Sequence, residues 1–317
     1  MVKFLKKNFL FLAPMAGFSN SACRLICREY GADGVVGEFV YSRAVLSGAQ
    51  RVLEKMAFSE AERPVGIQIF GSDAGEIAEA ASLVEERFAP DFIDINFGCP
   101  APNATHAGAG SALLKNPKQM CAIISAAARA LKRTPITAKM RTGWDSQSII
   151  VPDAAQALAD SGAQMITLHG RTKARGYEGD ADWDLIEATA RTVSVPVIGN
   201  GSVEKLSAER LRDSACVGFM IGRAALGNPW IFQAVRAKLD GGEYSEPSPN
   251  DRARLALRYA QIVSGGEYSG IDAENLTHAK VQIMRFLKNS AGFKKLRIAL
   301  KNINTLDELK NLLCDYI

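Results

Sequence analysis

Short apolar runs alternate with longer amphipathic segments over most of the chain. Segments with helical spacing of apolar residues separate most of these runs, for example Ala74–Phe88, Pro117–Leu131, Asp153–Gly162 and Lys205–Asp213. Eight runs have the length and composition of buried strands: Phe9–Met15, Gly34–Glu38, Val65–Phe70, Phe92–Asn96, Ile136–Met140, Met165–His169, Val195–Asn200 and Gly218–Ile221. Alternating strands and helices are typical of parallel sheets, and eight units over about 230 residues predict a TIM barrel, which commonly takes about 250.

The region after the eighth run has a different pattern. A doubly wound sheet is the alternative to a barrel, but its G-x-G-x-x-G fingerprint is absent after the first strand. Residues 243–250 contain two prolines and no periodicity, which indicates a linker. Helical patterns follow at Arg252–Val263, Ala273–Ser290 and Leu306–Tyr316. We therefore predict an α/β fold, a TIM (β/α)8 barrel over residues 1–242, followed by a small all-helical domain over residues 243–317.

Composition limits the classes of protein that the chain can belong to. The six cysteines are scattered and form neither a disulfide framework nor a C-x-x-C zinc pair, so no metal is expected. No apolar run approaches the ~18 residues that a membrane span needs. The first apolar stretch, Phe9 to Ala13, is too short for the core of a signal peptide. We expect a cytoplasmic monomer that does not bind membranes.

Polar side chains follow the predicted strands at the points where they end. Active sites of TIM barrels lie at the C-terminal ends of the strands, so these groups are expected to converge there. They include Glu38, Gln68, Asn96, Lys139, Arg141, His169, Arg171, Asn200 and Arg223. Cys99 lies on the loop directly after the fourth run. Position alone leaves open whether Cys99 is a small buried residue or a reactive one.

Two glycine-containing segments indicate a phosphate site. Gly199-Asn200-Gly201 follows the seventh run and Gly222-Arg223 follows the eighth. Loops at these two places commonly bind phosphate in TIM barrels through exposed backbone N–H groups. Glycine allows the backbone to approach closely, and the guanidinium of Arg223 can bind two phosphate oxygens.

The predicted helical domain carries a run of positive charge. Residues 278–302 contain no Asp or Glu, and their cations are Lys280, Arg285, Lys288, Lys294, Lys295, Arg297 and Lys301. Such runs are often only solvated surfaces. A one-signed stretch on a small appended domain is also typical of nucleic-acid binding, although the net charge of the whole chain is only +4.

Several motifs together carry a resemblance to a known family. Over essentially the whole chain, the sequence resembles the tRNA-dihydrouridine synthases, flavoenzymes that reduce uridines in tRNA, and it is most similar to the bacterial B-type group. The matching segments are Ala13-Pro14-Met15-Ala16-Gly17, Gln68-Ile69-Phe70-Gly71-Ser72, Asn96-Phe97-Gly98-Cys99-Pro100, Gly108-Ala109-Gly110-Ser111, Lys139-Met140-Arg141-Thr142-Gly143-Trp144, His169-Gly170-Arg171-Thr172, Asn200-Gly201, Gly222-Arg223-Ala224 and Gly227-Asn228-Pro229-Trp230.

The resemblance implies a reaction and its residues. FMN would be bound in the barrel mouth and reduced by NADPH, hydride would pass from flavin N5 to uracil C6, and Cys99 would donate the proton to C5. Asn96 and Arg171 would position the uridine. The tRNA would be bound by Lys280, Arg285, Lys294, Lys295 and Arg297. The cofactor-binding residues would be Pro14, Met15, Ala16, Gln68, Lys139, His169, Asn200, Gly201, Ser202, Gly222 and Arg223.

The sequence departs from the family pattern at two places. Asn103 stands where the pattern Cys-Pro-x-x-Lys-Val has lysine, and Asn20 lies where Gly-x-Thr-Asp is usual. Two alternatives remain. One is an FMN-dependent dehydrogenase of free pyrimidines, of the dihydroorotate-oxidising type. The other is an RNA-binding relative whose catalysis is altered or lost.

Overall fold

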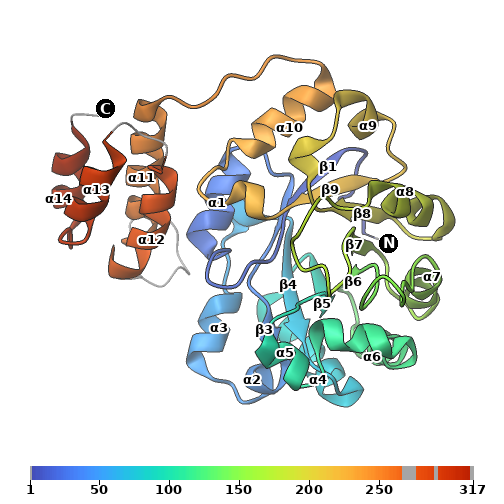
Figure 1. Cartoon of the computed structure of the whole chain (residues 1–317). Coiled ribbons are helices and arrows are strands. Elements are labelled where there is room, and N and C mark those ends of the chain that lie inside the picture. The colour runs from blue at the N-terminus through green and yellow to red at the C-terminus, as the bar shows by residue number, and fades with distance from the viewer. Residues whose placement is uncertain (1, 266–275, 289–291, 315–317) are drawn as a thin grey trace.

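A computed structural model describes residues 2–265, 276–288 and 292–314. Its centre is a parallel β-barrel (Figure 1), which confirms the predicted TIM barrel. The strands follow the order β2-β1-β9-β8-β7-β6-β5-β4, and pairing of β2 with β4 closes the barrel. A two-residue strand, β3 (Val40–Tyr41), adds to β4. The barrel strands are β1 (Phe9–Leu12), β2 (Gly34–Val36), β4 (Val65–Phe70), β5 (Phe92–Phe97), β6 (Ile136–Arg141), β7 (Ile166–His169), β8 (Val197–Asn200) and β9 (Gly218–Ile221).

The predicted strand bounds differ from the observed ones by up to three residues. The largest difference is in the first strand, which was predicted to reach Met15 but ends at Leu12. Pro14 has no N–H to continue the ladder. The chain turns instead, with the N–H groups of Phe18 and Ser19 both donating to the carbonyl of Met15 at 3.0 Å.

The helices lie outside the barrel and cover it. The helices of the barrel region are α1 (Ser21–Glu29), α2 (Ser42–Leu46), α3 (Gln50–Met56), α4 (Ala74–Phe88), α5 (Pro102–His106), α6 (Pro117–Ala130), α7 (Asp153–Asp160), α8 (Trp183–Thr192), α9 (Ala208–Arg212) and α10 (Ile231–Asp240). Four 3-10 helices are interspersed: η1 (Glu60–Glu62), η2 (Gly110–Lys115), η3 (Val203–Lys205) and η4 (Arg223–Ala225). The predicted helix Lys205–Asp213 is wrong at its start, because η3 and a short loop precede α9.

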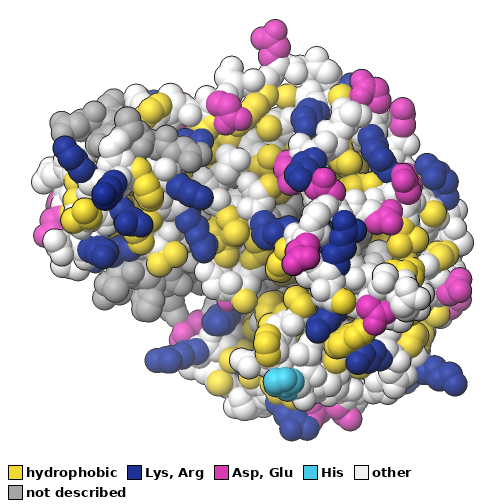
Figure 2. Space-filling view, in the orientation of Figure 1, with side chains coloured by type: hydrophobic (Ala, Val, Ile, Leu, Met, Phe, Trp, Pro, Cys, Tyr) yellow, Lys and Arg dark blue, Asp and Glu magenta, His cyan; other side chains and the backbone are white. Residues whose placement is uncertain are grey.

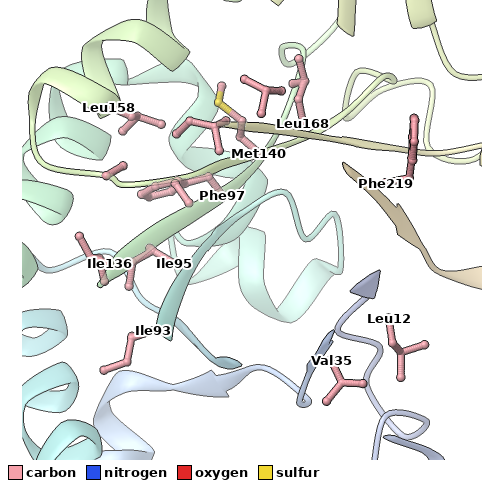
Figure 3. Close-up of a cluster of buried hydrophobic side chains, with 14 of the residues drawn as sticks. Leu12, Val35, Ile93, Ile95, Phe97, Ile136, Met140, Leu158, Leu168 and Phe219 are labelled. Atoms are coloured by element: carbon pink, nitrogen blue, oxygen red, sulfur yellow. The ribbon is translucent and has the colours of Figure 1, made fainter. Parts of the chain in front are cut away.

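Side chains alternate along each strand between the outside of the barrel and its inside. Side chains such as Ile93, Ile95 and Phe97 point outward and form the large apolar core between barrel and helices (Figure 3). The intervening residues of the strands point into the barrel. At its N-terminal end they are aromatic: Phe9, Phe11 and Phe92 pack together with Phe4.

This aromatic cluster needs glycines on the neighbouring strands. A Cβ at Gly66 would lie 2.3 Å from the ring of Phe92, and one at Gly34 would lie 2.8 Å from the ring of Phe9. The four rings therefore fill the N-terminal end of the barrel, and polar inward-facing residues occur only beyond them toward the other end.

The C-terminal helices pack against one side of the barrel (Figure 1). They are α11 (Pro249–Val263), α12 (Leu276–Phe286), α13 (Phe293–Leu300) and α14 (Leu306–Leu313). Their apolar core also contains residues of α1, such as Cys23 and Ile26, and Trp230. The predicted helix Ala273–Ser290 is described only as α12, since residues 273–275 and 289–290 lie outside the described residues. The division into domains at residue 242 stays a prediction.

No helix in the described part of the chain is both long enough and apolar enough to cross a membrane.

A buried ion pair fixes the first loop of the barrel. Arg24 on α1 is 2% exposed and pairs with Glu62, whose side chain is fully buried. Arg24 also donates to the carbonyls of Ser19 and Ala57, at 2.8 and 2.7 Å. The carboxylate of Glu62 accepts in addition from the backbone N–H of Ser59. Because both charges are fully hydrogen-bonded, removal of one partner leaves the other buried without compensation.

We predict that Glu62→Ala lowers the free energy of unfolding by about 3–5 kcal/mol, because the guanidinium of Arg24 stays buried without its anion. Urea denaturation followed by circular dichroism measures the change. Glu60→Ala is the control: Glu60 pairs with Arg63 but its side chain is 83% exposed, so its loss should cost less than about 1 kcal/mol. Equal effects of the two substitutions would contradict the prediction.

Candidate active site

A cavity of about 560 Å³ opens at the C-terminal ends of the strands. It brings together most of the residues that the sequence analysis proposed for the site. Those that line it are Pro14, Met15, Ala16, Asn96, Cys99, Lys139, His169, Arg171, Asn200, Gly201, Ser202, Gly222, Arg223 and Arg285. Gln68, Lys280, Lys294, Lys295 and Arg297 do not line it.

The loop that carries Cys99 is held by hydrogen bonds within itself. The side-chain oxygen of Asn96, at the end of β5, accepts from the backbone N–H groups of Gly98 at 2.9 Å and Cys99 at 2.8 Å. The carbonyl of Cys99 accepts from the N–H of Ser111 at 3.0 Å. Gly110 has φ +59°, and a Cβ there would lie 2.9 Å from that carbonyl. The close return of the chain past Cys99 therefore requires glycine at position 110.

Burial changes the acidity of the Cys99 thiol. Its pKa is raised because the thiol is partly removed from water, although Arg141 and Lys139 act in the opposite direction. The thiol is therefore protonated at neutral pH and faces a cavity that can admit a substrate.

A hydrogen-bonded chain below the cavity orients Asn96. The Asn96 amide donates to Oε1 of Gln68 at 2.7 Å, and the Gln68 amide donates to Oδ2 of Asp94 at 2.6 Å. Thr137 donates to the other Asp94 oxygen at 2.6 Å. Burial raises the pKa of Asp94 to about 6, partly offset by these hydrogen bonds and by Lys139. Gln68 is fully buried below the cavity, where its amide bonds Asn96 and Asp94, and its contact with the flavin stays a prediction.

Lys139 projects into the cavity from β6. Its Nζ donates to Oδ1 of Asn200 at 3.0 Å, and the Asn200 amide donates to the carbonyl of Met220 at 2.7 Å. Burial, with a smaller contribution from Arg141, lowers the pKa of Lys139 to about 8. Lys139 is therefore mostly a cation at neutral pH, held in place by a residue of the predicted phosphate loop.

His169 and Arg171 each leave one buried nitrogen without a hydrogen-bond partner among the described residues, Nδ1 and Nη1 respectively. Burial and the surrounding cations lower the pKa of His169 well below its ordinary value, so the ring is neutral. Nη2 of Arg171 donates to Oγ of Ser202 at 2.9 Å, and the predicted role of Arg171 in positioning the substrate stays a prediction. A Cβ on Gly201, which has φ +105°, would lie 3.2 Å from Nη1 of Arg171. Arg171 thus lies beside the predicted phosphate loop.

Several residues that line the cavity were not among the proposed site residues, and Arg141 and Tyr177 are two of them. Arg141 is buried and donates to the carbonyls of Gly98, Thr172 and Gly176 at 2.8–2.9 Å, which joins the Cys99 loop to the loop after β7. Tyr177, on that second loop, is 52% exposed, and the guanidinium of Arg223 lies 4.1 Å from its ring centroid. Arg141 was expected among the polar groups at the strand ends but was given no role in the site. No signal in the sequence indicates Tyr177.

The proposed RNA-binding cations divide into two groups. Arg285 on α12 lines the cavity, with its guanidinium 5.3 Å from the ring centroid of Phe18. Lys294, Lys295 and Arg297 are exposed on α13, away from the cavity. Lys280 donates to the carbonyl of Lys301 at 2.9 Å. In Figure 2, Lys and Arg side chains are spread over the surface of the C-terminal helices, at the left of the view.

The two departures from the family pattern occupy different surroundings. Asn103 is exposed on α5. Asn20 caps the N-terminus of α1, where its side chain accepts from the N–H of Cys23, and its amide donates to the Tyr259 hydroxyl at 3.1 Å. Asn20 thus connects the barrel to α11. Among the described residues, no group of three or more His, Cys, Asp or Glu side chains could hold a metal ion.

Comparison with known proteins gives a family match over nearly the whole chain. The sequence matches the family described as "Dihydrouridine synthase (Dus)" over residues 11–316. The chain belongs to the dihydrouridine synthase family. Its relatives include a "Probable tRNA-dihydrouridine synthase" of Aquifex aeolicus, 34% identical over 96% of this chain and 94% of the relative. A "tRNA-dihydrouridine synthase B" of Klebsiella pneumoniae is 39% identical over 77% of this chain and 76% of the relative.

Similarity to solved structures supports the fold alone for this member of the dihydrouridine synthase family. A histamine dehydrogenase from Rhizobium sp. 4-9 superposes with a TM-score of 0.54 at 12% identity, over 80% of this chain and 49% of the other. The barrel is therefore shared with proteins of very different sequence.

The lowered pKa of Lys139 predicts a pH dependence of stability in the ligand-free protein. Between pH 8 and the ordinary lysine pKa of about 10.4, the unfolded chain binds more protons than the folded chain, so the free energy of unfolding rises with pH. Relative to Lys139→Met, wild type should gain about 2 kcal/mol across this window, because the cavity leaves the amine some solvent.

Urea titrations of both proteins at several pH values measure this difference. Lys132→Met, at an exposed position, is the control and should follow the wild-type profile. Parallel profiles for wild type and Lys139→Met would mean that Lys139 titrates as it does in water.

Proposed function

We propose that this protein is a tRNA-dihydrouridine synthase, a cytoplasmic oxidoreductase that uses NADPH and FMN to reduce uridines in tRNA to 5,6-dihydrouridine. The family match over nearly the whole chain and the printed names of the relatives support the substrate and the reaction. The observation that carries the proposal is the cavity itself. It places a protonated thiol, Cys99, in the same mouth as a cationic, glycine-containing cradle.

The residues of the cradle fit the phosphate of FMN. Arg171 offers a buried Nη1 that has no protein partner among the described residues, and Gly201 leaves open the space beside it that a Cβ would fill. Ser202 and Arg223 add a hydroxyl and a second guanidinium at the same side of the cavity. Paired guanidinium groups and backbone N–H groups are the donors that phosphate prefers.

The flavin ring would lie across Pro14, Met15 and Ala16, with Lys139 and His169 as its polar neighbours. When bound, FMN supplies the hydride that reduces the uracil. Lys139 contributes a positive charge beside the ring, where negative charge develops on the reduced flavin. His169 is neutral, so its unpartnered Nδ1 can form a hydrogen bond without adding a further cation. Gln68 acts indirectly, because it accepts a hydrogen bond from the Asn96 amide and so orients that side chain.

Cys99 donates the proton that completes the reduction at C5 of the uracil. The thiol needs no activation for this, because burial keeps it protonated at neutral pH. Asn96 orients the uridine with its amide while its oxygen holds the Cys99 loop. Arg141 keeps that loop at a fixed distance from the loop after β7. The proton donor is thus positioned by three hydrogen bonds that do not involve its own sulfur.

The substrate must enter as a single base. A uridine in a duplex cannot reach a cavity at the end of a barrel, so it has to be unstacked and turned outward, which costs least in a loop. The C-terminal helices bind the surrounding RNA through exposed cations on α13, and Arg285 links those helices to the mouth. A dehydrogenase of free pyrimidines has no need for these helices, which makes it the weaker candidate.

The direct test uses purified protein, NADPH and an unmodified tRNA transcript. We expect bound FMN, bleaching of its absorbance by NADPH, and nucleosides whose mass has increased by two hydrogen atoms. Reduction of free uracil or orotate in place of tRNA would favour the pyrimidine dehydrogenase. Binding of tRNA with no reduced uridine would favour an RNA-binding relative that has lost catalysis.

We predict that Cys99→Ala slows uridine reduction about 10²-fold or more while reduction of the flavin by NADPH is unchanged, because only the second step needs the proton. Stopped-flow absorbance separates the two steps. Wild-type activity should fall as pH rises through the raised pKa of the thiol, since the protonated form is the active one. Cys121→Ala, at a half-buried position on α6 outside the cavity, is the control. Dihydrouridine formed at the wild-type rate would mean that Cys99 is structural.

We predict that removing the charges of Lys294, Lys295 and Arg297 weakens binding of all tRNAs alike and lowers the salt dependence by up to about one unit of slope per phosphate contact. The matched control replaces Lys3, Lys132 and Arg133, three exposed cations near the N-terminal ends of strands. Filter-binding titrations at several salt concentrations compare the two triple variants. Equal slopes would place the RNA elsewhere on the protein.

A further inference from the structure

Two lysines lie over the same tryptophan ring on loops at the C-terminal end of the barrel, outside the lining of the cavity. Nζ of Lys115 is 3.7 Å from the ring centroid of Trp144, and Nζ of Lys173 is 4.3 Å from it. The two ammonium groups are therefore no farther apart than the sum of these distances. Attraction between a cation and the face of an indole holds each flexible side chain in place. We call these three residues the Lys–Trp–Lys cluster.

Three successive barrel loops build this cluster. Lys115 is the last residue of η2, after β5, and Trp144 and Lys173 follow β6 and β7. The loops are joined through the backbone: the N–H of Lys173 donates to Gly143 at 2.9 Å, and that of Ala174 donates to Trp144 at 2.8 Å. The cluster thus belongs to a set of loops that backbone hydrogen bonds join together.

The positive charge of the cluster is only partly offset among the described residues, where the Ser148 hydroxyl and, to a smaller extent, the charge of Lys115 lower the pKa of the nearby Asp145. No described carboxylate lies within ion-pair distance of Lys115 or Lys173. The nearby Asp145 accepts instead from the Ser148 hydroxyl at 2.7 Å and the N–H of Gln147 at 3.0 Å. Two neighbouring cations repel each other, and an anion bound beside them lowers that repulsion.

The position of the cluster is across the mouth from the C-terminal helices. Strand β6 is four strands from β1 in either direction around the barrel. Phe18, which contacts Arg285 of α12, follows β1, whereas Trp144 follows β6. Arg141 ties the cluster to the catalytic loop, since it donates both to Gly98 and to Thr172, the residue before Lys173.

We propose that the Lys–Trp–Lys cluster binds the phosphate backbone of the RNA on the far side of the mouth from the basic helices. The inference rests on the proposed function, because it takes tRNA to be the substrate. An RNA whose target base lies in the cavity must have backbone on both sides of that base. The C-terminal helices bind the backbone on one side of the base, and the two lysines of the cluster bind it on the other side. Sequence-independent contacts of this kind position RNA without reading bases.

The test compares two double variants of the FMN-loaded protein. Lys115→Ala/Lys173→Ala removes both charges of the cluster, and Lys3→Ala/Lys132→Ala removes two exposed charges near the N-terminal end of the barrel. At low salt we expect the first to bind an unmodified tRNA transcript about tenfold more weakly, with a salt slope lower by up to about two. The second should match wild type. Lys115→Arg/Lys173→Arg should restore both values, because it restores the charges.

Flavin reduction by NADPH is measured on the same proteins. It should be unchanged, because the cluster is proposed to serve the RNA and not the phosphates of the dinucleotide. Slower reduction at low NADPH with unaltered tRNA binding would overturn the proposal in favour of a reductant site. Affinity and slope equal to those of the Lys3/Lys132 control would also overturn it, while leaving the proposed function intact if wild type reduces uridine. A wild-type protein that neither binds nor reduces tRNA would overturn both.

Discussion

Closure of the barrel is the constraint on which the site depends. Once β2 pairs with β4, every second residue of each strand must point into a space that no other element fills. At one end phenylalanines occupy that space, and toward the other end it holds Asp94, Lys139 and Asn200. Charged groups can be sustained there because each is hydrogen-bonded to a residue of another strand. The same closure that builds the core therefore positions the polar groups of the mouth.

The chain from Asp94 through Gln68 to Asn96 illustrates how a buried network orients the loop that carries Cys99. Each amide in it has one orientation that satisfies its neighbours, so the Asn96 oxygen is left facing the N–H groups of Gly98 and Cys99. A buried polar network destabilises the fold when one of its groups lacks a hydrogen-bond partner, and it is rigid when every group has one. The position of the thiol thus depends on Asp94 and Gln68, which do not line the cavity.

Much of this arrangement could be predicted from the sequence. Strand periodicity gave the barrel, and the polar strand ends gave most of the cavity lining, because period-two alternation and parallel pairing are local rules. The place of Arg171 beside Ser202, and of Gln68 below the cavity, could not be predicted, since each depends on how adjacent loops fold back. Tyr177 and the cluster around Trp144 join loops far apart in sequence, and no single segment carries a signal for them.

The aromatic rings at the N-terminal end of the barrel have a consequence for the order of events. Phe9, Phe11 and Phe92 are almost fully buried and leave no passage through the barrel. A molecule in the cavity must therefore depart by the route through which it arrived. In the proposed reaction, an RNA bound across the mouth would close that route, so a large reductant and the RNA would have to bind in turn. The phenylalanines would thus determine the order in which the two molecules bind, although they do not line the cavity.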